Sequence, residues 1–199
     1  MKKSYSLFLG MILTVMSFHS FAESEDPARV VKQTVTAVLS ILDNSDLSEE
    51  EKRQQVFDIA DDRINFKEMS RRVLAINWRK ADESQQAVFA DRFRLILLHN
   101  YWTRIKRYAG EQIEYTAVSY DSTDVATVDT VIVKAGDVRI PISYRMKRIV
   151  SVWYAYDFII ENLSLVQSFR NEYTAIIKNH GINGLLEQME KEVNNYQKN

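Results

Sequence analysis

The stretch from Val138 to Ile160, VRIPISYRMKRIVSVWYAYDFII, decides the fold of this chain. In its first half, apolar residues at even positions alternate with Pro141 and polar or charged residues at odd positions, which is the period of a strand with one solvated face. Its second half, from Val152 onward, is apolar on both faces, so we expect this strand to be central or covered on both sides. The stretch predicts two antiparallel strands, over 137–148 and 150–160.

Two more strands and several helices are predicted around this stretch. Residues rich in Val, Ile, Thr and Tyr, separated by turn signals, indicate strands over 112–120 and 125–134. Helical spacing of apolar residues, N-capping signals and a glycine after a helix end predict helices elsewhere. The predicted helices cover 27–42, 48–61, 66–76, 82–110, 165–179 and 182–195. Helices followed by an antiparallel meander and further helices predict an α+β protein.

The first 22 residues have the pattern of a secretory signal peptide. Lys2 and Lys3 precede an apolar run from Leu7 to Phe18, and Ser20-Phe21-Ala22 predicts cleavage after Ala22. The run is short of the roughly 20 residues that span a bilayer, which disfavours the alternative of an uncleaved anchor. We therefore expect an exported protein.

Composition limits the function of the expected mature chain, 23–199. The absence of Cys excludes thiolate metal sites, thiol nucleophiles and disulfides. Without Lys2 and Lys3, 24 basic and 27 acidic side chains remain, which argues against a general nucleic-acid binder. Residues 23–62 are acidic and 63–108 are basic, which marks either a docking surface or complementary faces of neighbouring helices. One domain is expected, with helices in 27–110, an antiparallel sheet over 112–160 and C-terminal helices over 165–195.

Few residues have a catalytic pattern. Only His99 and His180 remain after signal cleavage, and there is no P-loop, nucleophile elbow or metal-binding spacing. Asp157 is the one candidate, because a carboxyl group in an apolar half-barrel beside tyrosines can act as a general base. The chain would then be a small enzyme of the NTF2-like type, acting on a hydrophobic substrate. A buried, hydrogen-bonded Asp explains the same residue more simply, so we expect no enzyme, metal or cofactor.

Large apolar side chains are abundant instead. The chain has 9 Phe, 10 Tyr and 3 Trp, and β-branched residues line one sheet face opposite a long helix with an aromatic stripe. The sheet and this helix either pack to normal interior density or stand apart and leave a slot for an apolar ligand. Composition alone leaves both alternatives open.

A series of short motifs runs through the chain. WYAYDFIIENLSLV at 153–166 and GINGLL at 181–186 are close to the patterns W-x-x-Y-D-x-x-x-E-G-x-S and G-I-x-G-L. Upstream, VLAINWRKA at 73–81, the segment 89–93 and the tyrosines of 101–110 are close to L-G-x-x-W, F-x-x-x-F and Y-x-x-x-x-x-x-Y-x-G. In order and spacing, these motifs resemble the MlaC/toluene-tolerance family over about residues 27–195.

Two positions depart from the family pattern. The glycine of E-G-x-S is Asn162 here, and the glycine of L-G-x-x-W is Ala75. Because Asn tolerates the left-handed conformation, the turn at Asn162 is expected to survive. Ala75 is expected to be a mild change within a helix.

The resemblance implies a soluble periplasmic phospholipid carrier of Gram-negative bacteria, with a role in outer-membrane lipid asymmetry. The implied fold is a twisted antiparallel sheet of about four strands, wrapped by N- and C-terminal helices and enclosing an apolar cavity for acyl chains. The implied partners are an inner-membrane ABC transporter that contains MlaD and an outer-membrane MlaA–porin complex. Phospholipid is then the cargo rather than a cofactor.

On this hypothesis we expect eleven side chains to line the cavity. They are Trp78, Phe93, Leu97, Tyr101, Ile105, Ile140, Ile142, Tyr144, Val152, Tyr154 and Phe158. Plain core packing is the alternative for each of them. For the last strand, a slip of one residue would bring Trp153 and Ile159 to the cavity instead.

Other residues are expected at the mouth or in structural roles. Arg71, Arg72, Arg104 and Arg107 are candidates to flank the lipid head group or to dock membrane partners, with solvated surface as the alternative. Four residues of the family motif are interpreted as structural: a covered Trp153, a hydrogen-bonded pair of Tyr156 and Asp157, and a helix cap at Ser164.

Overall fold

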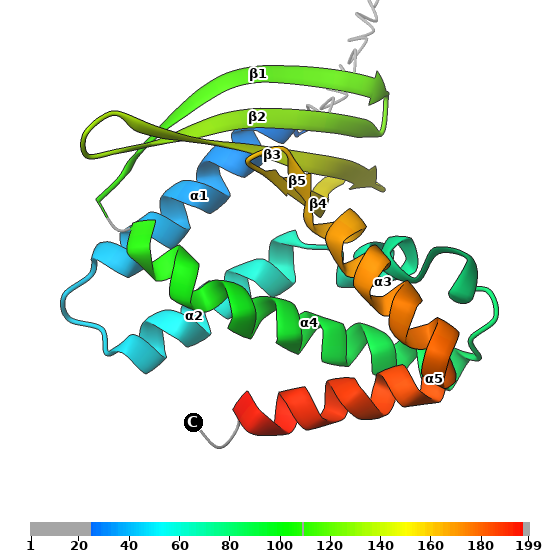
Figure 1. The fold of residues 1–199 in the computed structure, drawn as a ribbon. Helices are drawn as coiled ribbons and strands as arrows, with labels where there is room; N and C mark the ends of the chain where they lie inside the picture. The colour runs from blue at the N-terminus through cyan, green and yellow to red at the C-terminus, as the bar shows by residue number, and fades with distance from the viewer. Residues whose placement is uncertain (1–24, 109, 197–199) are drawn as a thin grey trace, which may run out of the picture.

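The computed structural model describes residues 25–108 and 110–196, so the predicted signal peptide lies outside the described residues. A five-stranded antiparallel sheet lies over a layer of helices (Figure 1). The elements are α1 (Pro27–Asp43), α2 (Glu49–Arg63), α3 (Phe66–Leu74), the 3₁₀ turn η1 (Ala75–Asn77), α4 (Glu83–Ile105), the 3₁₀ turn η2 (Lys106–Tyr108), β1 (Gln112–Ser122), β2 (Val125–Lys134), β3 (Val138–Ile149), β4 (Val152–Ile160), β5 (Leu163–Ser164) and α5 (Leu165–Tyr196). The predicted α+β class is confirmed, with one short strand, β5, beyond the four expected.

The sheet is a meander in which each strand pairs with its neighbour in sequence, in the order β1-β2-β3-β4-β5. The pairing of β3 with β4 contains one irregularity. Arg145 pairs with Asp157 and Met146 pairs with Ala155, so Tyr156 is an extra residue on β4. Such an insertion is a β-bulge, which bends the strand and shifts its alternation of faces by one residue.

The bulge decides which side chains of β4 face the helices. Before it, Trp153 and Ala155 pack in an apolar cluster with the start of α1. After it, Phe158 and Ile160 are the inward-facing residues and pack toward α3, α4 and α5. A single period-2 pattern along the whole strand is therefore wrong for this protein.

Three apolar clusters make up the core. The largest joins α3, α4 and α5 around the stacked rings of Phe89 and Phe93, whose centroids are 5.7 Å apart. The second joins the start of α1 to β2, β3 and β4. The third joins the end of α1 to α2 and the C-terminal half of α4 around Phe57 and Trp102. The space between these clusters is where a ligand site can lie.

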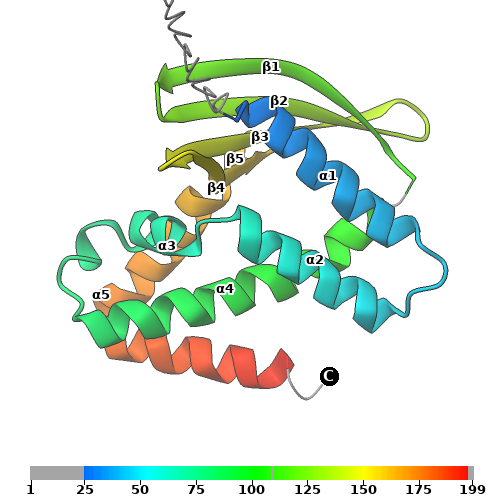
Figure 2. The same ribbon diagram turned by 180° about the vertical axis from the view of Figure 1, so that it is seen from behind.

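The α1–α2 hairpin is fixed to the sheet at its two open ends. The indole N–H of Trp153 donates a hydrogen bond of 2.5 Å to the carbonyl of Glu25, just before α1. The backbone N–H of Asn65, just after α2, donates a bond of 2.9 Å to the carbonyl of Ala155. Both anchors are on β4, whereas α1 descends away from the sheet toward the loop that joins it to α2 (Figure 2). The hairpin is therefore held to the sheet at its open end, while its loop end lies away from the sheet (Figure 2).

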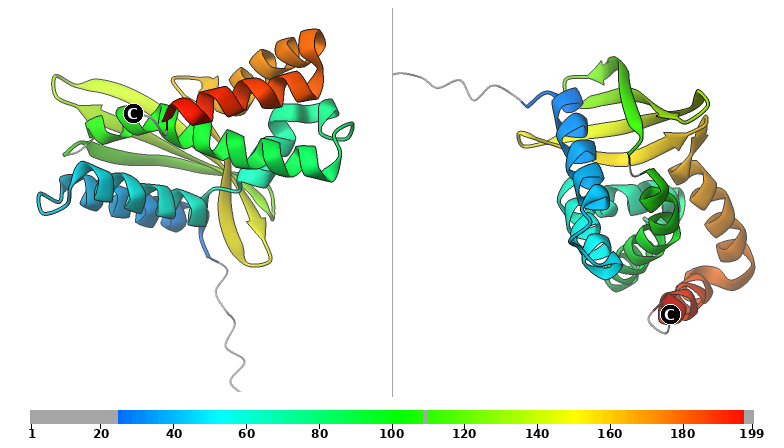
Figure 3. Two further views of the ribbon diagram at one scale, coloured as in Figure 1. Left: turned by 90° about the horizontal axis from the view of Figure 1, so that it is seen from below. Right: turned by 90° about the vertical axis from the view of Figure 1, so that its left-hand side faces the viewer.

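The helix α5 is interrupted at Gly181, where φ is 68° and ψ is 179°. These dihedrals place the residue in a region that favours glycine. Beyond the break, the second half of α5 runs along α4 (Figure 3), where Arg92 donates a hydrogen bond of 2.7 Å to the carbonyl of Leu186. The two C-terminal helical segments that the sequence predicts are therefore present, joined by a sharp turn.

The two positions that depart from the glycine pattern behave differently. Asn162 has a φ of 66° and follows Glu161 with a φ of 49°, so the tight turn between β4 and β5 is kept, as expected. Ala75 does not lie within a regular helix, as the sequence suggested. It ends α3 with a φ of 51° and a ψ of −116°, a conformation that is costly for any residue with a Cβ.

We therefore expect Ala75→Gly to raise the free energy of unfolding by about 1 kcal/mol, because glycine relieves the strain at this exposed position. Urea denaturation followed by circular dichroism measures the difference. The matched control is Ala87→Gly, which lies exposed inside α4 and is expected to lower stability by about 1 kcal/mol. Equal destabilisation by both substitutions would contradict the prediction.

Candidate functional site

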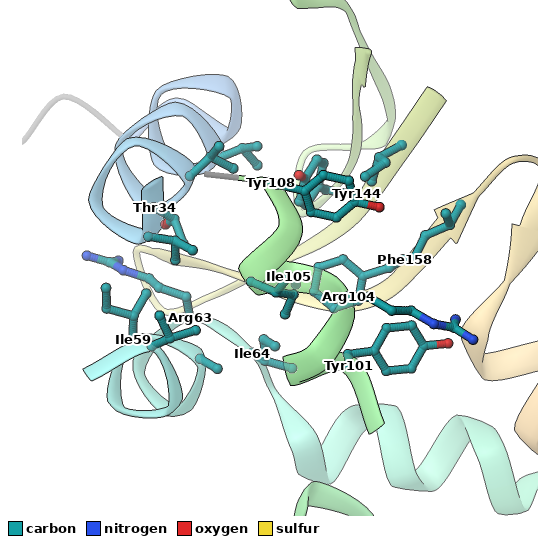
Figure 4. A pocket seen from close by; sticks show the side chains of 18 of the residues that line it. Thr34, Ile59, Arg63, Ile64, Tyr101, Arg104, Ile105, Tyr108, Tyr144 and Phe158 are labelled. Atoms are coloured by element: carbon teal, nitrogen blue, oxygen red, sulfur yellow. The ribbon is translucent and has the colours of Figure 1, made fainter. Parts of the chain in front are cut away.

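A large cavity lies between the sheet and the helices α1, α2 and α4. Its volume is about 530 Å³, which is within the usual range for sites of small ligands. The walls are mostly aliphatic and aromatic side chains, which come from α1, α2, α4, η2 and the first four strands (Figure 4). We call this space the central cavity. Apolar walls of this kind favour contact with apolar groups.

Three charged residues are among those that line the central cavity: Arg63, Arg104 and Glu161. Figure 4 shows Arg63 beside Thr34 and Ile59 on one side, and Arg104 beside Tyr101 on another. The Arg104 guanidinium is 5.2 Å from the centroid of the Tyr101 ring. Neither arginine forms an ion pair within the part of the chain that the structure describes, so both cations are available to an anionic group at the edge.

The interior of the central cavity is neutral. Its most deeply buried titratable group is Tyr144, and burial raises the pKa of this hydroxyl to about 12. The phenol therefore stays uncharged at any physiological pH. Across residues 25–108 and 110–196, no group of three His, Asp or Glu side chains is placed to hold a metal ion. The buried wall around Tyr144 is therefore uncharged.

Most of the side chains expected at the cavity do line it. Seven of the eleven contribute to the walls: Leu97, Tyr101, Ile105, Ile140, Ile142, Tyr144 and Phe158. They come from α4, β3 and β4, so the structure brings together residues that are up to about sixty positions apart in the sequence. The helical spacing on α4 and the alternation on β3 were sufficient to select them.

Two of the expected residues lie in the helical core instead. Phe93 is fully buried against Phe169 and Tyr173 of α5, and Trp78 packs in the same cluster. The long helix α4 uses its N-terminal half to pack on α3 and α5 and faces the central cavity only from Leu97 onward. The spacing of apolar residues along α4 does not show that the two parts of this helix face different neighbours.

The other two expected residues that lie outside the central cavity are on β4. Val152 and Tyr154 do not line the central cavity, whereas Ala155, Phe158 and Ile160 do. The cause is the bulge at Tyr156, which inverts the faces of the strand between its first and second halves. The sequence shows the apolar residues on both faces but not the inserted position.

The sequence interpretation also missed one whole wall of the central cavity. The apolar stripe of α1 faces the cavity along its length, from Val31 through Val35 and Val38 to Leu42. This stripe was visible as helical spacing. Its first part also packs on the sheet through Val30, Val31 and Val35, and its last part, at Leu42, belongs to the third cluster. The signal was therefore present, but nothing local distinguishes a stripe that packs from one that faces a cavity.

Asp157 is turned away from the central cavity. It lines a second space of about 290 Å³, which we call the polar pocket, with Arg72, Arg145, Tyr156, Ser164, Val166, Gln167 and Arg170. Asp157 follows the bulge and precedes Phe158, which faces the opposite side of the sheet. A general base acting on a substrate in the central cavity would need the other orientation.

The contacts of Asp157 are structural. Its carboxylate accepts a hydrogen bond of 2.7 Å from the Ser164 hydroxyl, one of 3.0 Å from the Val166 N–H and one of 3.4 Å from Arg145. Ser164 in turn accepts a bond of 3.0 Å from the Gln167 N–H, which confirms the predicted helix cap. The expected hydrogen bond between Tyr156 and Asp157 is not formed.

Three of the four arginines proposed for the mouth lie elsewhere. Arg71, Arg72 and Arg107 do not line the central cavity, whereas Arg104 does. Arg71 and Arg72 instead donate to the carboxylate of Glu68, at 2.8 and 2.9 Å. They therefore belong to an ion-pair network on α3 rather than to the cavity edge.

Glu68 is the shared acceptor of that network. Its burial opposes ionisation, but the hydrogen bond from Arg71 and the charges of Arg72, Arg71 and Lys147 overcome this effect and lower the pKa of Glu68 to about 2. Lys147 lies on β3, so the carboxylate links α3 to the sheet. A carboxylate with a lowered pKa stabilises the fold above its unfolded pKa, near 4.5, and loses that contribution as the pH falls toward 2.

We therefore expect the stability difference between the native protein and Glu68→Gln to depend on pH. At pH 7 the native protein should be more stable by about 2–3 kcal/mol, and the difference should shrink steadily from pH 4.5 toward pH 2. Urea denaturation of both proteins across this range measures it. A difference that stays constant with pH would show that the ionised carboxylate is not responsible.

No helix in the described residues is both long and apolar enough to cross a membrane.

Two comparisons with known proteins match this chain over most of its length. The sequence model of the MlaC protein family matches residues 32–191. A solved structure described as the phospholipid-binding protein from Ralstonia solanacearum in complex with a phospholipid has a TM-score of 0.76 and 22% sequence identity, with 86% of this chain and 98% of that chain covered. The match extends over nearly the whole described fold, and the chain belongs to the MlaC family.

Proposed function

We propose that this protein binds phospholipid and carries it through the periplasm between the outer and inner membranes, with the acyl chains in the central cavity. The observation that carries the proposal is a cavity of about 530 Å³ with mostly apolar walls. Membership of the MlaC family supports it, as does the phospholipid bound by a protein of the same fold.

The physical need for such a carrier comes from the acyl chains. A two-chain phospholipid has about 30 methylene groups, and each is worth about 0.8 kcal/mol when it is withdrawn from water. Exposing both chains to the aqueous periplasm therefore costs on the order of 25 kcal/mol. Apolar walls offset this cost without any reactive group, so a carrier needs a cavity, an opening and no catalyst.

The side chains that we propose for contact with the acyl chains are those of the sequence hypothesis that line the cavity, together with the stripe of α1. From the first group these are Leu97, Tyr101, Ile105, Ile140, Ile142, Tyr144 and Phe158. The head group stays at the edge, because burial of an unpaired phosphate is costly. We propose that Arg104 and Arg63, which line the cavity and have no carboxylate partner among the described residues, flank it.

The proposed cellular setting follows from the family and from the sequence of the first 22 residues. We propose export by a cleaved signal peptide and function in the periplasm. The proposed partners are an inner-membrane ABC transporter that contains MlaD and an outer-membrane MlaA–porin complex, which would deliver and accept the lipid. The role of the pathway would be to maintain lipid asymmetry of the outer membrane.

Lipid analysis of the purified protein tests the proposal. The protein is exported to the periplasm of a Gram-negative host, purified without detergent, extracted with organic solvent and analysed by mass spectrometry. We expect phospholipid in a fixed molar ratio to protein, close to one lipid or a small whole number. Protein that is folded, as judged by circular dichroism, but releases only trace lipid would refute the proposal.

A further inference from the structure

The polar pocket is lined by residues of α3, β3, β4 and α5. Asp157 and Phe158 are consecutive residues on β4, and one lines the polar pocket while the other lines the central cavity. A lipid held in the central cavity is therefore separated from the polar pocket by the strand itself. Any ligand of the polar pocket is a second ligand.

Three guanidinium groups from three different elements surround this pocket. Arg72 comes from α3, Arg145 from β3 and Arg170 from α5. Arg72 lies 4.0 Å above the ring of Tyr156, which fixes its plane. Arg170 is held by neutral oxygens alone, since it donates to the carbonyl of Arg72 at 3.0 and 2.7 Å and to the side-chain oxygen of Gln167 at 3.3 Å.

The positive charge at this surface exceeds the negative charge. Glu68 is the one carboxylate shared by Arg71, Arg72 and Lys147, and Asp157 is the one carboxylate beside Arg145. Within the described residues, Arg170 has no acidic partner at all. Five cations are therefore grouped around two carboxylates, and the carboxylate of Asp157 is already saturated by three donors.

Several hydrogen-bond donors at the polar pocket remain unused. Arg72 uses only its Nε toward Glu68, and Arg145 uses only one terminal nitrogen toward Asp157. Tyr156 is 6% exposed, and its hydroxyl has no hydrogen-bond partner among residues 25–108 and 110–196. The hydroxyl oxygen itself is not buried, so it is accessible in the pocket and can donate to an acceptor-rich ligand.

We propose that the polar pocket binds a phosphate group, held by Arg72, Arg145 and Arg170 and by the Tyr156 hydroxyl. A carboxylate pairs with one guanidinium group in a planar, bidentate geometry. A phosphate has several acceptor oxygens that point in different directions, so it can accept hydrogen bonds from three arginines at once. The phosphate comes either from free phosphate in solution or from the head group of a lipid in a membrane surface. In the second case the pocket orients the carrier on the bilayer while the cargo lies on the other side of β4.

Titration with inorganic phosphate at low ionic strength tests the site, with side-chain NMR signals of the arginines as the readout. We expect saturable binding to the native protein and a loss of affinity of at least about tenfold in Arg72→Gln/Arg145→Gln, because the double variant removes two charge-assisted hydrogen-bond donors from the phosphate. The conservative variant Tyr156→Phe should weaken binding by about three- to tenfold with the fold unchanged.

The control variant is Arg71→Gln. Arg71 contacts the same Glu68 carboxylate but does not line the polar pocket, so it should change phosphate affinity by less than about twofold. Absence of saturable phosphate binding to the folded native protein overturns the proposal. An equal loss in Arg71→Gln and in the double variant also overturns it, because a diffuse charged surface would then explain the binding.

Vesicles distinguish the two sources of phosphate. Flotation with vesicles of phosphatidylcholine plus phosphatidic acid, compared with phosphatidylcholine alone, measures membrane binding. Binding that depends on phosphatidic acid and is lost in the double variant assigns the site to a head group. Phosphate binding without vesicle binding assigns it to free phosphate. The lipid content of the double variant should equal that of the native protein, so failure of this site and failure of the proposed carrier function give different results.

Discussion

Ile142→Trp is expected to lower the phospholipid content of the purified protein. Ile142 lies on β3, is 8% exposed, lines the central cavity and is outside the three apolar clusters. An indole at this position occupies the space that we assign to acyl chains. Forcing extra atoms into a filled apolar site costs about 1–3 kcal/mol, so lipid affinity should fall by at least about tenfold. Solvent extraction and mass spectrometry measure the remaining lipid.

The matched control is Ser143→Trp. Ser143 is the next residue on the same strand, and successive side chains of a strand point to opposite faces of the sheet. The same indole therefore lies outside the central cavity and should leave the lipid content unchanged. If Ile142→Trp keeps its lipid, or if Ser143→Trp loses it equally, the acyl chains do not occupy the central cavity.

Asp157→Ala is expected to lower the free energy of unfolding by about 2–4 kcal/mol. Asp157 is 1% exposed and accepts hydrogen bonds from Ser164, the Val166 N–H and Arg145. Its removal leaves the buried Val166 N–H and the half-buried Ser164 hydroxyl without this acceptor at the start of α5, and a buried donor without an acceptor costs about 1–3 kcal/mol. Asp157→Asn keeps one acceptor oxygen and should lose about half as much. Urea denaturation at pH 7 measures both.

An exposed ion pair of the same chemistry is the control for Asp157. Asp124 and Arg148 form a bond of 2.9 Å at the edge of the sheet, where the Asp124 side chain is 61% exposed. Asp124→Ala should lower stability by less than about 1 kcal/mol, because exposed pairs contribute little. An equal loss for Asp124→Ala and Asp157→Ala would show that burial of the Asp157 network is not what stabilises the start of α5.

The local patterns of the sequence were enough to predict the helical and strand segments and many of the residues that line the central cavity. Alternation from Ile140 to Tyr144 selected the inward face of β3 because one face of that strand is solvated and the other is not. The same reasoning placed Leu97, Tyr101 and Ile105 on one side of α4. Where a helix or strand buries one face against the same neighbour along its length, periodicity alone identifies which of its side chains face inward.

The errors share a different cause. Phe93 has the same spacing on α4 as the cavity residues, yet it packs on α5, because the neighbour of the helix changes along its length. Val152 and Tyr154 continue the pattern of Phe158, yet the bulge at Tyr156 turns them to the other face. The sequence predicts a helical Ala75, but its backbone dihedrals lie outside the helical region. In each case the spacing of apolar residues does not show the change of neighbour or of backbone geometry that decides where the side chain lies.

The sequence by itself determined the α+β class, the strand and helix segments and the wealth of apolar surface, because these depend on neighbours within a few residues along the chain. Only the tertiary structure decided which apolar faces close on each other and which stay apart. Trp153 and Ala155 hold the α1–α2 hairpin to one strand while its loop end rests on α4, and this geometry keeps the central cavity open. It also brings Arg72, Arg145 and Arg170 to one pocket, since charges from three separate elements meet only when the chain is folded.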